Sequence, residues 1–245
     1  MTPKKSYRRG YPVAVLVGLN AKQAVVWRIF SGVVKAEKTI QFNADVANSK
    51  AMYLFNEAIV NALRPTLQSG VRSIILAAPS RTNYAEQFLR HIKTHHTWLM
   101  QDSNRAIFTE MTGSATTLAE VTTLTRDPKF KQIVTQTTQK ETENLLELIE
   151  KHLSASNETP LILYSFDDIE THILSPQKKD ECQPEYLLLT DTFLSTNRQK
   201  NRLQRLIQIA ANKQIKTRIV KTDSPAGQRL TQFGGMVCLI KFPAT

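Results

Sequence analysis

The sequence SPAGQRLTQFGGMVCLIKFP, residues 224–243, decides the fold of the second half of the chain. Residues 224–233 predict a helix. After Gly234 and Gly235, residues 236–242 are mostly apolar and predict a final strand. A helix that passes directly into a buried strand is typical of an α/β domain.

The residues before this stretch alternate in the same way. Residues 165–174 predict a helix, 186–190 a buried strand, 197–212 an amphipathic helix and 217–220 another strand. Strands and helices that alternate at this spacing predict a small sheet sandwiched by helices.

The first half of the chain begins with three apolar segments. Residues 12–18, 24–30 and 33–42 are rich in valine, and short turns separate them, so they predict an antiparallel three-strand meander. Apolar residues at spacings of three and four over residues 52–63 then predict a core-facing helix. Pro65 predicts the end of this helix, because proline disrupts a helix interior.

The rest of the first half contains further sequence signals of strands and helices. Residues 72–78 predict a buried strand, and Asn83 with Glu86 three residues later predicts the capped start of the next helix. The remaining predicted elements are a strand at 106–111, a short helix at 116–123 and a long helix at 129–153. Residues 154–157, SASN, predict a linker, so we expect two domains.

Composition narrows the class of protein. The 245 residues are 41% hydrophobic and 22% charged, as in soluble globular proteins, and no apolar run is long enough to span a membrane. The two cysteines, Cys182 and Cys238, have neither disulfide-framework nor zinc-site spacing. We therefore expect a cytoplasmic protein with no membrane partner. The basic and apolar start of the chain resembles a signal peptide, and a basic arm before a buried strand is the alternative interpretation.

The net charge of +11 is concentrated in the first hundred residues, which hold 14 Lys and Arg against 4 Asp and Glu. Such a surface attracts polyanions. The candidate RNA-binding or ribosome-binding residues are basic groups in an amino-terminal arm and at the start of the 197–212 helix: Lys4, Lys5, Arg8, Arg9, Arg198, Lys200, Arg202 and Arg205. Positive charge at a helix start opposes the helix dipole, so phosphate contact is the hypothesis there, with a solvated face as the alternative.

Several motifs together resemble the Pelota and archaeal/eukaryotic peptide chain release factor family. The apolar strand before Asp191 and Phe193 ends as in that family, and the later pattern continues through Gly235 to Phe242-Pro243. The other positions that match the family's motifs are Pro79, Phe88, Gly113, Leu118, Glu120, Val121, Ser224, Gly227 and Leu230. The resemblance spans nearly the whole chain and is strongest over residues 186–243.

The resemblance implies an architecture. A basic arm at 1–10 would precede a ribonuclease-H-like mixed-sheet domain at 11–155, which matches the family's central domain. A small three-layer α/β domain at 158–245, similar to RNA-binding ribosomal proteins, would match the C-terminal domain. The implied partners are the ribosome or its rRNA and tRNA, a translational GTPase and a recycling ABC ATPase.

The departures from the family concern its chemistry. Release factors carry a Gly-Gly-Gln loop in the central domain, whereas the corresponding residues 43–50, NADVANSK, contain no glycine. Gly227-Gln228 does not replace that loop, because it lies in the other domain. The family's glycine-phenylalanine pair after Pro79 is Ser80-Arg81 here. The resemblance to the central domain begins at about Tyr11, so we expect the family's amino-terminal decoding-site domain to be missing. We therefore expect a non-catalytic factor in surveillance, rescue or recycling, with no cofactor.

Two other groups of residues give weaker evidence for a functional site. His91 and His95 share a helix face and adjoin His96, but no third ligand lies nearby in the sequence, so a solvated helix end is preferred to a metal site. The acids of the long helix are interpreted as its exposed face: Glu141, Glu143, Glu147 and Glu150. Two alternatives stay open: a peptidyl-tRNA hydrolase or RNA-cleaving enzyme with an unrecognised site, and a stand-alone RNA-binding or adaptor protein.

Overall fold

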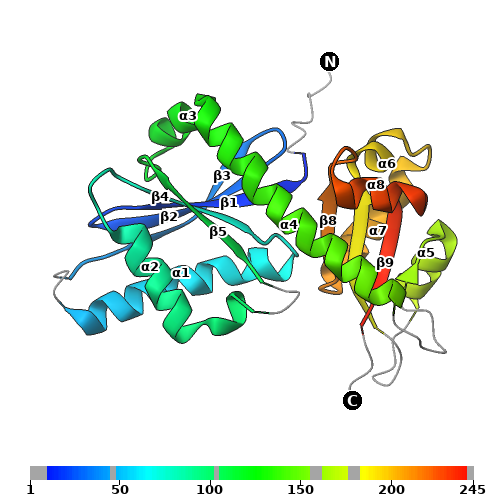
Figure 1. Ribbon diagram of the computed structural model, residues 1–245, viewed down its shortest axis with the longest axis horizontal. Helices are drawn as coiled ribbons and strands as arrows, with labels where there is room; N and C mark the ends of the chain where they lie inside the picture. Colours follow the sequence, from blue (N-terminus) through cyan, green and yellow to red (C-terminus); the bar gives the residue numbers. More distant parts are fainter. Residues whose placement is uncertain (1–9, 45–47, 102–104, 155–161, 176–182, 242–245) are drawn as a thin grey trace, which may run out of the picture. The chain divides into compact units, whose positions relative to one another are not determined.

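The computed structural model describes residues 10–44, 48–101, 105–154, 162–175 and 183–241 (Figure 1). The chain forms two compact units. Unit 1 comprises Met1–Pro65 and Val71–Thr138, and unit 2 comprises Thr66–Gly70 and Gln139–Thr245. The division falls inside two helices, between Pro65 and Thr66 and between Thr138 and Gln139. The predicted domains, 11–155 and 158–245, were instead separated at the predicted linker, and these bounds remain a prediction.

Unit 1 contains a five-stranded mixed sheet in the order β3-β2-β1-β4-β5. The strands are β1 (Pro12–Leu19), β2 (Gln23–Phe30), β3 (Val34–Gln41), β4 (Ser73–Ala78) and β5 (Ile107–Thr112). β1, β4 and β5 pair in parallel, and β2 pairs antiparallel with both β1 and β3. This order, with only β2 reversed, is ribonuclease-H-like, and it confirms the predicted meander.

Helices cover both faces of this sheet (Figure 1). Val121 of α3 (Leu118–Arg126) and Phe130 of α4 (Pro128–Ser154) pack on one face against alternate residues of β1 and β2. On this face the Trp27 indole donates a 2.7 Å hydrogen bond to the Ala115 carbonyl. The helices α1 (Ser49–Gln68) and α2 (Tyr84–His95) cover the other face, and a short 3₁₀ helix, η1 (Thr97–Leu99), follows α2.

The end of α1 and the capping of α2 differ from the prediction. α1 does not end before Pro65 but continues to Gln68. The last turn contains Thr66 and Leu67, both buried, so burial outweighs the hydrogen bond that proline cannot donate. Asn83 does occupy the N-cap of α2, but its side chain makes no capping hydrogen bond.

Unit 2 contains a four-stranded sheet in the order β6-β9-β7-β8. The strands are β6 (Ile162–Leu163), β7 (Pro184–Thr190), β8 (Lys216–Val220) and β9 (Met236–Ile240). β7 and β8 are parallel, and β9 runs antiparallel to both β6 and β7. The sequence predicted β7, β8 and β9 but missed the two-residue β6.

Successive residues of the central strands alternate between two apolar layers. Leu187 and Leu189 of β7 face α5 (Phe166–Leu174) and α7 (Lys200–Asn212). Leu188 faces the second half of α4 and α8 (Pro225–Gln232). Unit 2 therefore has the predicted three-layer α/β architecture, although the part of α4 in one outer layer lies before the predicted domain bounds of 158–245. The short helix α6 (Asp191–Thr196), which follows β7 directly, was not predicted.

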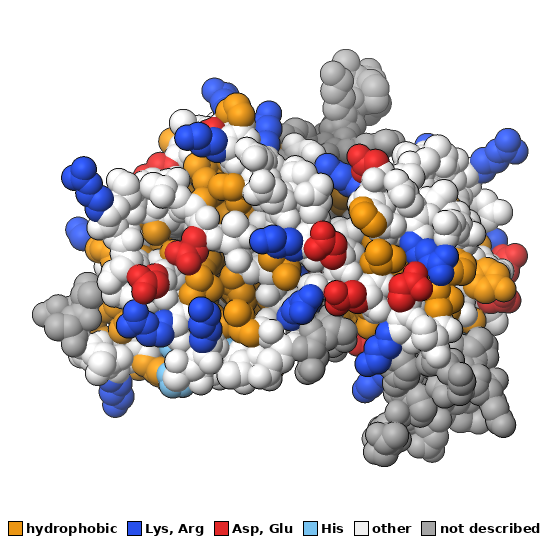
Figure 2. Space-filling view, viewed as in Figure 1, with side chains coloured by type: hydrophobic (Ala, Val, Ile, Leu, Met, Phe, Trp, Pro, Cys, Tyr) orange, Lys and Arg blue, Asp and Glu red, His pale blue; other side chains and the backbone are white. Residues whose placement is uncertain are grey.

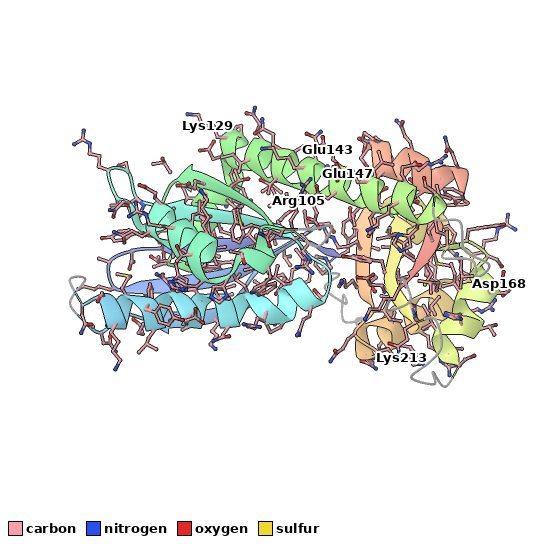
Figure 3. All side chains as sticks on the ribbon, turned by 60° about the horizontal axis from the view of Figure 1, so that its bottom comes forward. Arg105, Lys129, Glu143, Glu147, Asp168 and Lys213 are labelled. Carbon is pink, nitrogen blue, oxygen red and sulfur yellow. The ribbon has the colours of Figure 1, made fainter. Side chains whose placement is uncertain are left out.

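One acid of α4 is not on the exposed face. Glu143, Glu147 and Glu150 are exposed as predicted, and Figure 3 labels the first two on α4. Glu141 is buried, and its carboxylate lies 2.8 Å from Nε of Arg218 on β8. The prediction was wrong for Glu141 because a buried arginine from a distant strand neutralises it.

Among the described residues, no helix is both long and apolar enough to cross a bilayer. Cys182 lies outside the described residues. Cys238 is a buried free thiol on β9, and burial raises its pKa to about 12. The thiol is therefore uncharged and packs as an apolar side chain.

Candidate functional site

Two histidines and one glutamate converge within unit 1. Nε2 of His91 lies 3.0 Å from Oε1 of Glu57, and Nε2 of His96 lies 2.6 Å from the same oxygen. One ligand atom from each residue falls within 4.8 Å of the others. Both histidines are buried, and Glu57 is partly buried. We call these three residues the His-Glu-His cluster.

The end of α2 creates this arrangement. His91 lies on α2 and Glu57 lies on α1, so the packing of these two helices brings them together. If α2 continued, His96 would point roughly 140° away from His91 around the helix axis, since each residue adds about 100°. Instead, α2 ends at His95, and the backbone leaves the helix at His96 (φ −130°, ψ 47°). This turn directs the His96 ring back toward Glu57.

Aromatic side chains hold the imidazole rings in place. Tyr53 of α1 meets His91 edge to face, with ring centroids 5.1 Å apart, and it meets His95 at the same distance. Trp98 of η1 stands nearly perpendicular to the His96 ring at 6.4 Å. These contacts limit the rotation of the two rings that face Glu57.

The protonation states follow from burial and from these hydrogen bonds. Burial alone would raise the pKa of Glu57, but the hydrogen bonds from His96 and His91 outweigh it, and the pKa lies below the ordinary value. Burial lowers the pKa of His91, although the hydrogen bond with Glu57 opposes this. At neutral pH the cluster therefore presents an ionised carboxylate and a neutral His91 imidazole.

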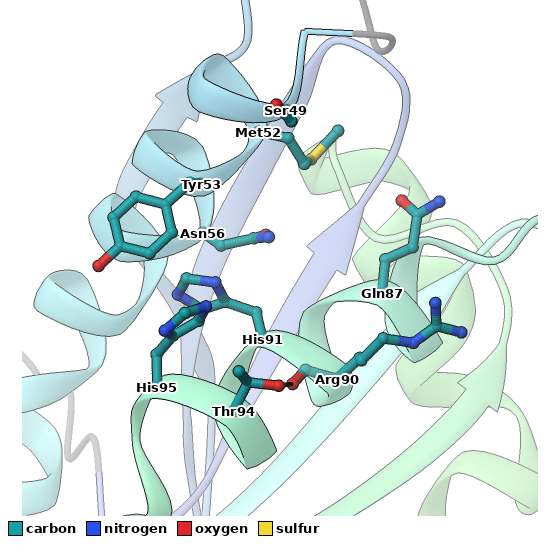
Figure 4. Close-up of a pocket in the computed structure, with 9 residues that line it drawn as sticks. All are labelled: Ser49, Met52, Tyr53, Asn56, Gln87, Arg90, His91, Thr94 and His95. Carbon is teal, nitrogen blue, oxygen red and sulfur yellow. Dashed lines mark hydrogen bonds between the residues drawn. The ribbon is translucent and has the colours of Figure 1, made fainter.

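A groove of about 390 Å³ borders the cluster (Figure 4). The residues that line it come from the first half of α1 and from α2: Ser49, Met52, Tyr53, Asn56, Gln87, Arg90, His91, Thr94 and His95. His91 belongs both to the wall of the groove and to the cluster. Of the three cluster residues, only His91 is among the residues that line the groove.

The sequence prediction was wrong about which residues lie close to His91. It paired His91 with His95 by helical spacing and favoured a solvated helix end, whereas His91 and His96 are buried. The third group, Glu57, comes from another helix, 34 residues before His91 in the sequence. No local pattern signals such a residue, because only the packing of α1 on α2 brings it close.

The candidate RNA-binding residues occupy different environments. Arg198, Lys200 and Arg205 are exposed. Lys200 and Arg205 lie on α7, whereas Arg198 lies before it, because the helix begins at Lys200 and not at residue 197. Arg202 instead donates from Nη2 to Asp167 at 2.6 Å and from Nε to Glu170 at 2.8 Å, and its guanidinium lies over the Phe166 ring. Asp167 and Glu170 on α5 therefore explain why the positively charged Arg202 is tolerated near the start of α7, where it opposes the helix dipole. The arm residues Lys4, Lys5, Arg8 and Arg9 lie outside the described part of the chain.

The face drawn in Figure 2 shows Lys and Arg side chains interspersed with Asp and Glu over the described residues. The net positive charge therefore does not translate into a purely basic surface on that face. Sequence counting could not reveal this mixing, since residues far apart in the chain lie side by side on a folded surface.

Gly227 is a motif position with a steric requirement. A Cβ atom on Gly227 would lie 2.0 Å from the Lys221 carbonyl oxygen, so the start of α8 can approach that backbone only without a side chain. The Ser224 hydroxyl caps α8 by accepting from the Gly227 amide at 3.1 Å. These residues therefore define the turn from β8 into α8.

Gly235 is a motif position with a conformational requirement. Its φ of +88° lies in the left-handed region, and a Cβ atom would lie 3.0 Å from the Cβ of Phe193. Its carbonyl accepts a 2.9 Å hydrogen bond from the Thr190 amide. Gly235 thus lets β9 begin beside the end of β7.

The two acidic motif positions, Asp191 and Glu120, hold the nearby backbone in place through hydrogen bonds. Asp191 accepts hydrogen bonds from the amide of Thr222 at 2.9 Å and from its hydroxyl at 2.6 Å, which joins β7 to the turn after β8. Burial would raise the pKa of Asp191, but the bonds from Thr222 and Thr192 outweigh it and lower the pKa. Glu120 closes a capping box with Thr117 at the start of α3.

Gly113, a further motif position, donates its amide to the Ala78 carbonyl at 2.9 Å, at the ends of β5 and β4. The segment that corresponds to the Gly-Gly-Gln loop leads from β3 into α1. Residues 45–47 of it lie outside the described residues, and Ala44, Asn48 and Lys50 are exposed. Gln228 is exposed on the first turn of α8 in unit 2.

Comparisons with known proteins identify a matching family and solved structures of similar fold. The family model described as eRF1 domain 3 matches residues 82–244. No curated protein matches the chain. Among solved structures, Saccharomyces cerevisiae Dom34, a translation termination-like factor involved in RNA quality control pathways and interacting with Hbs1, shares 18% identity with a TM-score of 0.50. That match covers 94% of this chain and 63% of Dom34.

An archaeal Pelota in a model of ribosome-bound Pelota and ABCE1 shares 16% identity, with a TM-score of 0.54 over 99% of this chain and 65% of that one. The chain thus spans somewhat less than two thirds of the length of both proteins, and at these identities the likeness shows the fold. The family model, by contrast, matches about two thirds of the sequence. The chain therefore belongs to the Pelota and eRF1 family, and it covers the family's central and C-terminal domains.

Proposed function

We propose that the chain is a non-catalytic, ribosome-associated translation factor of the Pelota type, acting in the cytoplasm in surveillance, rescue or recycling. The observation that carries this proposal is family membership over residues 82–244 together with the two-unit α/β fold. The likeness of the fold to Dom34 and to an archaeal Pelota, with TM-scores of 0.50 and 0.54, supports it.

The absence of release chemistry is supported by the segment between β3 and α1. Residues 43–50 contain neither glycine nor glutamine, so they offer no Gly-Gly-Gln loop to position a water molecule. Gln228 does not supply that function, because it lies on a helix of unit 2.

The partners follow from the relatives. Dom34 interacts with Hbs1, and the archaeal Pelota is ribosome-bound in a model that includes ABCE1. We therefore infer that this chain contacts the ribosome, its rRNA or tRNA, a translational GTPase and a recycling ABC ATPase. Exposed Arg198, Lys200 and Arg205 are the proposed phosphate-binding residues of unit 2, and Lys4, Lys5, Arg8 and Arg9 are proposed for the arm.

Sedimentation with ribosomes tests the proposal. The purified chain should pellet with ribosomes at low salt and be released as salt rises, because counterions weaken binding to phosphate. A parallel assay on peptidyl-tRNA should show no release above background. Failure to pellet at low salt, or recovery of one specific non-ribosomal RNA by crosslinking, would overturn it in favour of a free-standing RNA-binding protein. Release above background would favour the enzyme.

A further inference from the structure

We propose that the His-Glu-His cluster of Glu57, His91 and His96 is a binding site for one divalent transition-metal ion, with Zn²⁺ the best match. Nothing in the proposed function requires this site. The argument concerns unit 1 alone.

The donor set suits zinc. Imidazole nitrogen and carboxylate oxygen are both ordinary zinc ligands, and two histidines with one glutamate form a known three-ligand combination that leaves a fourth position open. Harder cations such as Mg²⁺ prefer oxygen ligands throughout, so the two nitrogens argue against them.

The spacing also suits zinc. Bonds of about 2.0–2.1 Å in tetrahedral geometry place ligand atoms roughly 3.3 Å apart. The two nitrogen-to-oxygen distances are 3.0 and 2.6 Å, so each needs to widen by less than about 1 Å to admit an ion. The two imidazole nitrogens lie within 4.8 Å of each other, so the three side chains would close around an ion by adjusting their torsions together.

The residues around the cluster favour metal binding. Tyr53 and Trp98 pack against the two liganding rings, and burial of His91 and His96 removes competing water. The groove gives an ion a route in, because His91 lines it. The fourth ligand would be water from this groove.

A metal-free interpretation makes a different prediction. If the cluster is only a hydrogen-bonded network, both imidazoles donate from Nε2 to the same carboxylate oxygen. Such a network rigidifies the junction of α1 and α2 but has no selective affinity for transition metals. Direct metal titration separates the two interpretations.

The experiment uses the untagged full chain, stripped with a chelator and titrated with Co²⁺. One equivalent should bind, with the visible absorption bands of tetrahedral Co²⁺, and Zn²⁺ should displace it. Absence of saturable binding, or bands of octahedral Co²⁺ that match those of the free ion, would overturn the proposal whether or not any variant folds.

Variants then assign the ligands. Glu57→Gln, His91→Gln and His96→Gln should each weaken Co²⁺ binding at least tenfold. His172→Gln is the matched control, since His172 lies on α5 in unit 2, outside both the cluster and the groove, and it should change binding less than twofold. Circular dichroism in the presence of chelator checks the fold of each variant. Equal weakening by His172→Gln and His96→Gln would contradict the assignment.

Discussion

Nε of Arg218 on β8 lies 2.8 Å from Oε1 of Glu141 on α4, and both side chains are more than nine-tenths buried. Removing one partner of a buried pair leaves an uncompensated charge, which costs about 3 to 5 kcal/mol. We expect Glu141→Ala to lower the free energy of unfolding by that amount in urea titrations followed by circular dichroism. Glu143→Ala, at an exposed position on the same helix, should change it by no more than about 0.5 kcal/mol.

Replacing both partners tests the origin of this effect. In Glu141→Leu with Arg218→Met no buried charge is left unpaired, so most of the stability should return. A double variant as unstable as Glu141→Ala would show that shape, rather than charge, controls the site.

Asp191 should contribute to stability through its hydrogen bonds with Thr222. Hydrogen bonds to a charged acceptor contribute about 1.5 kcal/mol or more, so we expect Asp191→Asn to lower the free energy of unfolding by about 1.5 kcal/mol at neutral pH. Asp168→Asn, at an exposed position of α5, should have a smaller effect. Chemical unfolding of the two variants under identical conditions measures this difference.

The same carboxylate predicts a pH dependence. Its pKa is lower in the folded chain than in the unfolded chain, so its contribution is complete above the unfolded pKa of about 4 and is lost as pH falls through the folded pKa. The stability difference between the native chain and Asp191→Asn should therefore be constant near neutral pH and shrink below about pH 4. A difference that stays constant through the acid range would contradict this account.

Gly227→Ala should strain the turn from β8 into α8. The added Cβ would lie 2.0 Å from a backbone oxygen, and such overpacking costs about 1 to 3 kcal/mol. Gln228→Ala at the next, exposed position is the control and should be nearly neutral. Thermal melting of both variants provides the comparison, and equal melting temperatures would show that the turn relaxes freely.

The exposed basic residues at the start of α7 and just before it should govern any ribosome affinity of unit 2. The triple variant of Arg198, Lys200 and Arg205 to Gln should weaken pelleting at low salt and reduce the salt dependence, by about one unit of slope for each phosphate group that the variant no longer binds. Arg202→Gln should leave the slope unchanged, because Arg202 is paired with Asp167 and Glu170. Equal slopes for the triple variant and the native chain would contradict the hypothesis that these residues bind phosphate.

Local sequence patterns predicted most strands and helices. Apolar residues recur at every second position in a half-buried strand and at every third or fourth position on the buried face of a helix. These patterns failed where a distant interaction decides. Thr66 and Leu67 are buried and carry α1 past Pro65, and Arg218 draws Glu141 into the interior. The His-Glu-His cluster was missed for the same reason, since Glu57 meets the two histidines only through packing of α1 on α2.

Both tryptophans of the chain belong to unit 1: Trp27, buried and hydrogen-bonded to Ala115, and Trp98, nearly half exposed beside His96. Intrinsic tryptophan fluorescence therefore reports on unit 1 alone and is silent on unit 2. Acrylamide should quench Trp98 before Trp27. The chain thus carries its own optical probe, which separates events near the His-Glu-His cluster from events in the C-terminal domain without any label.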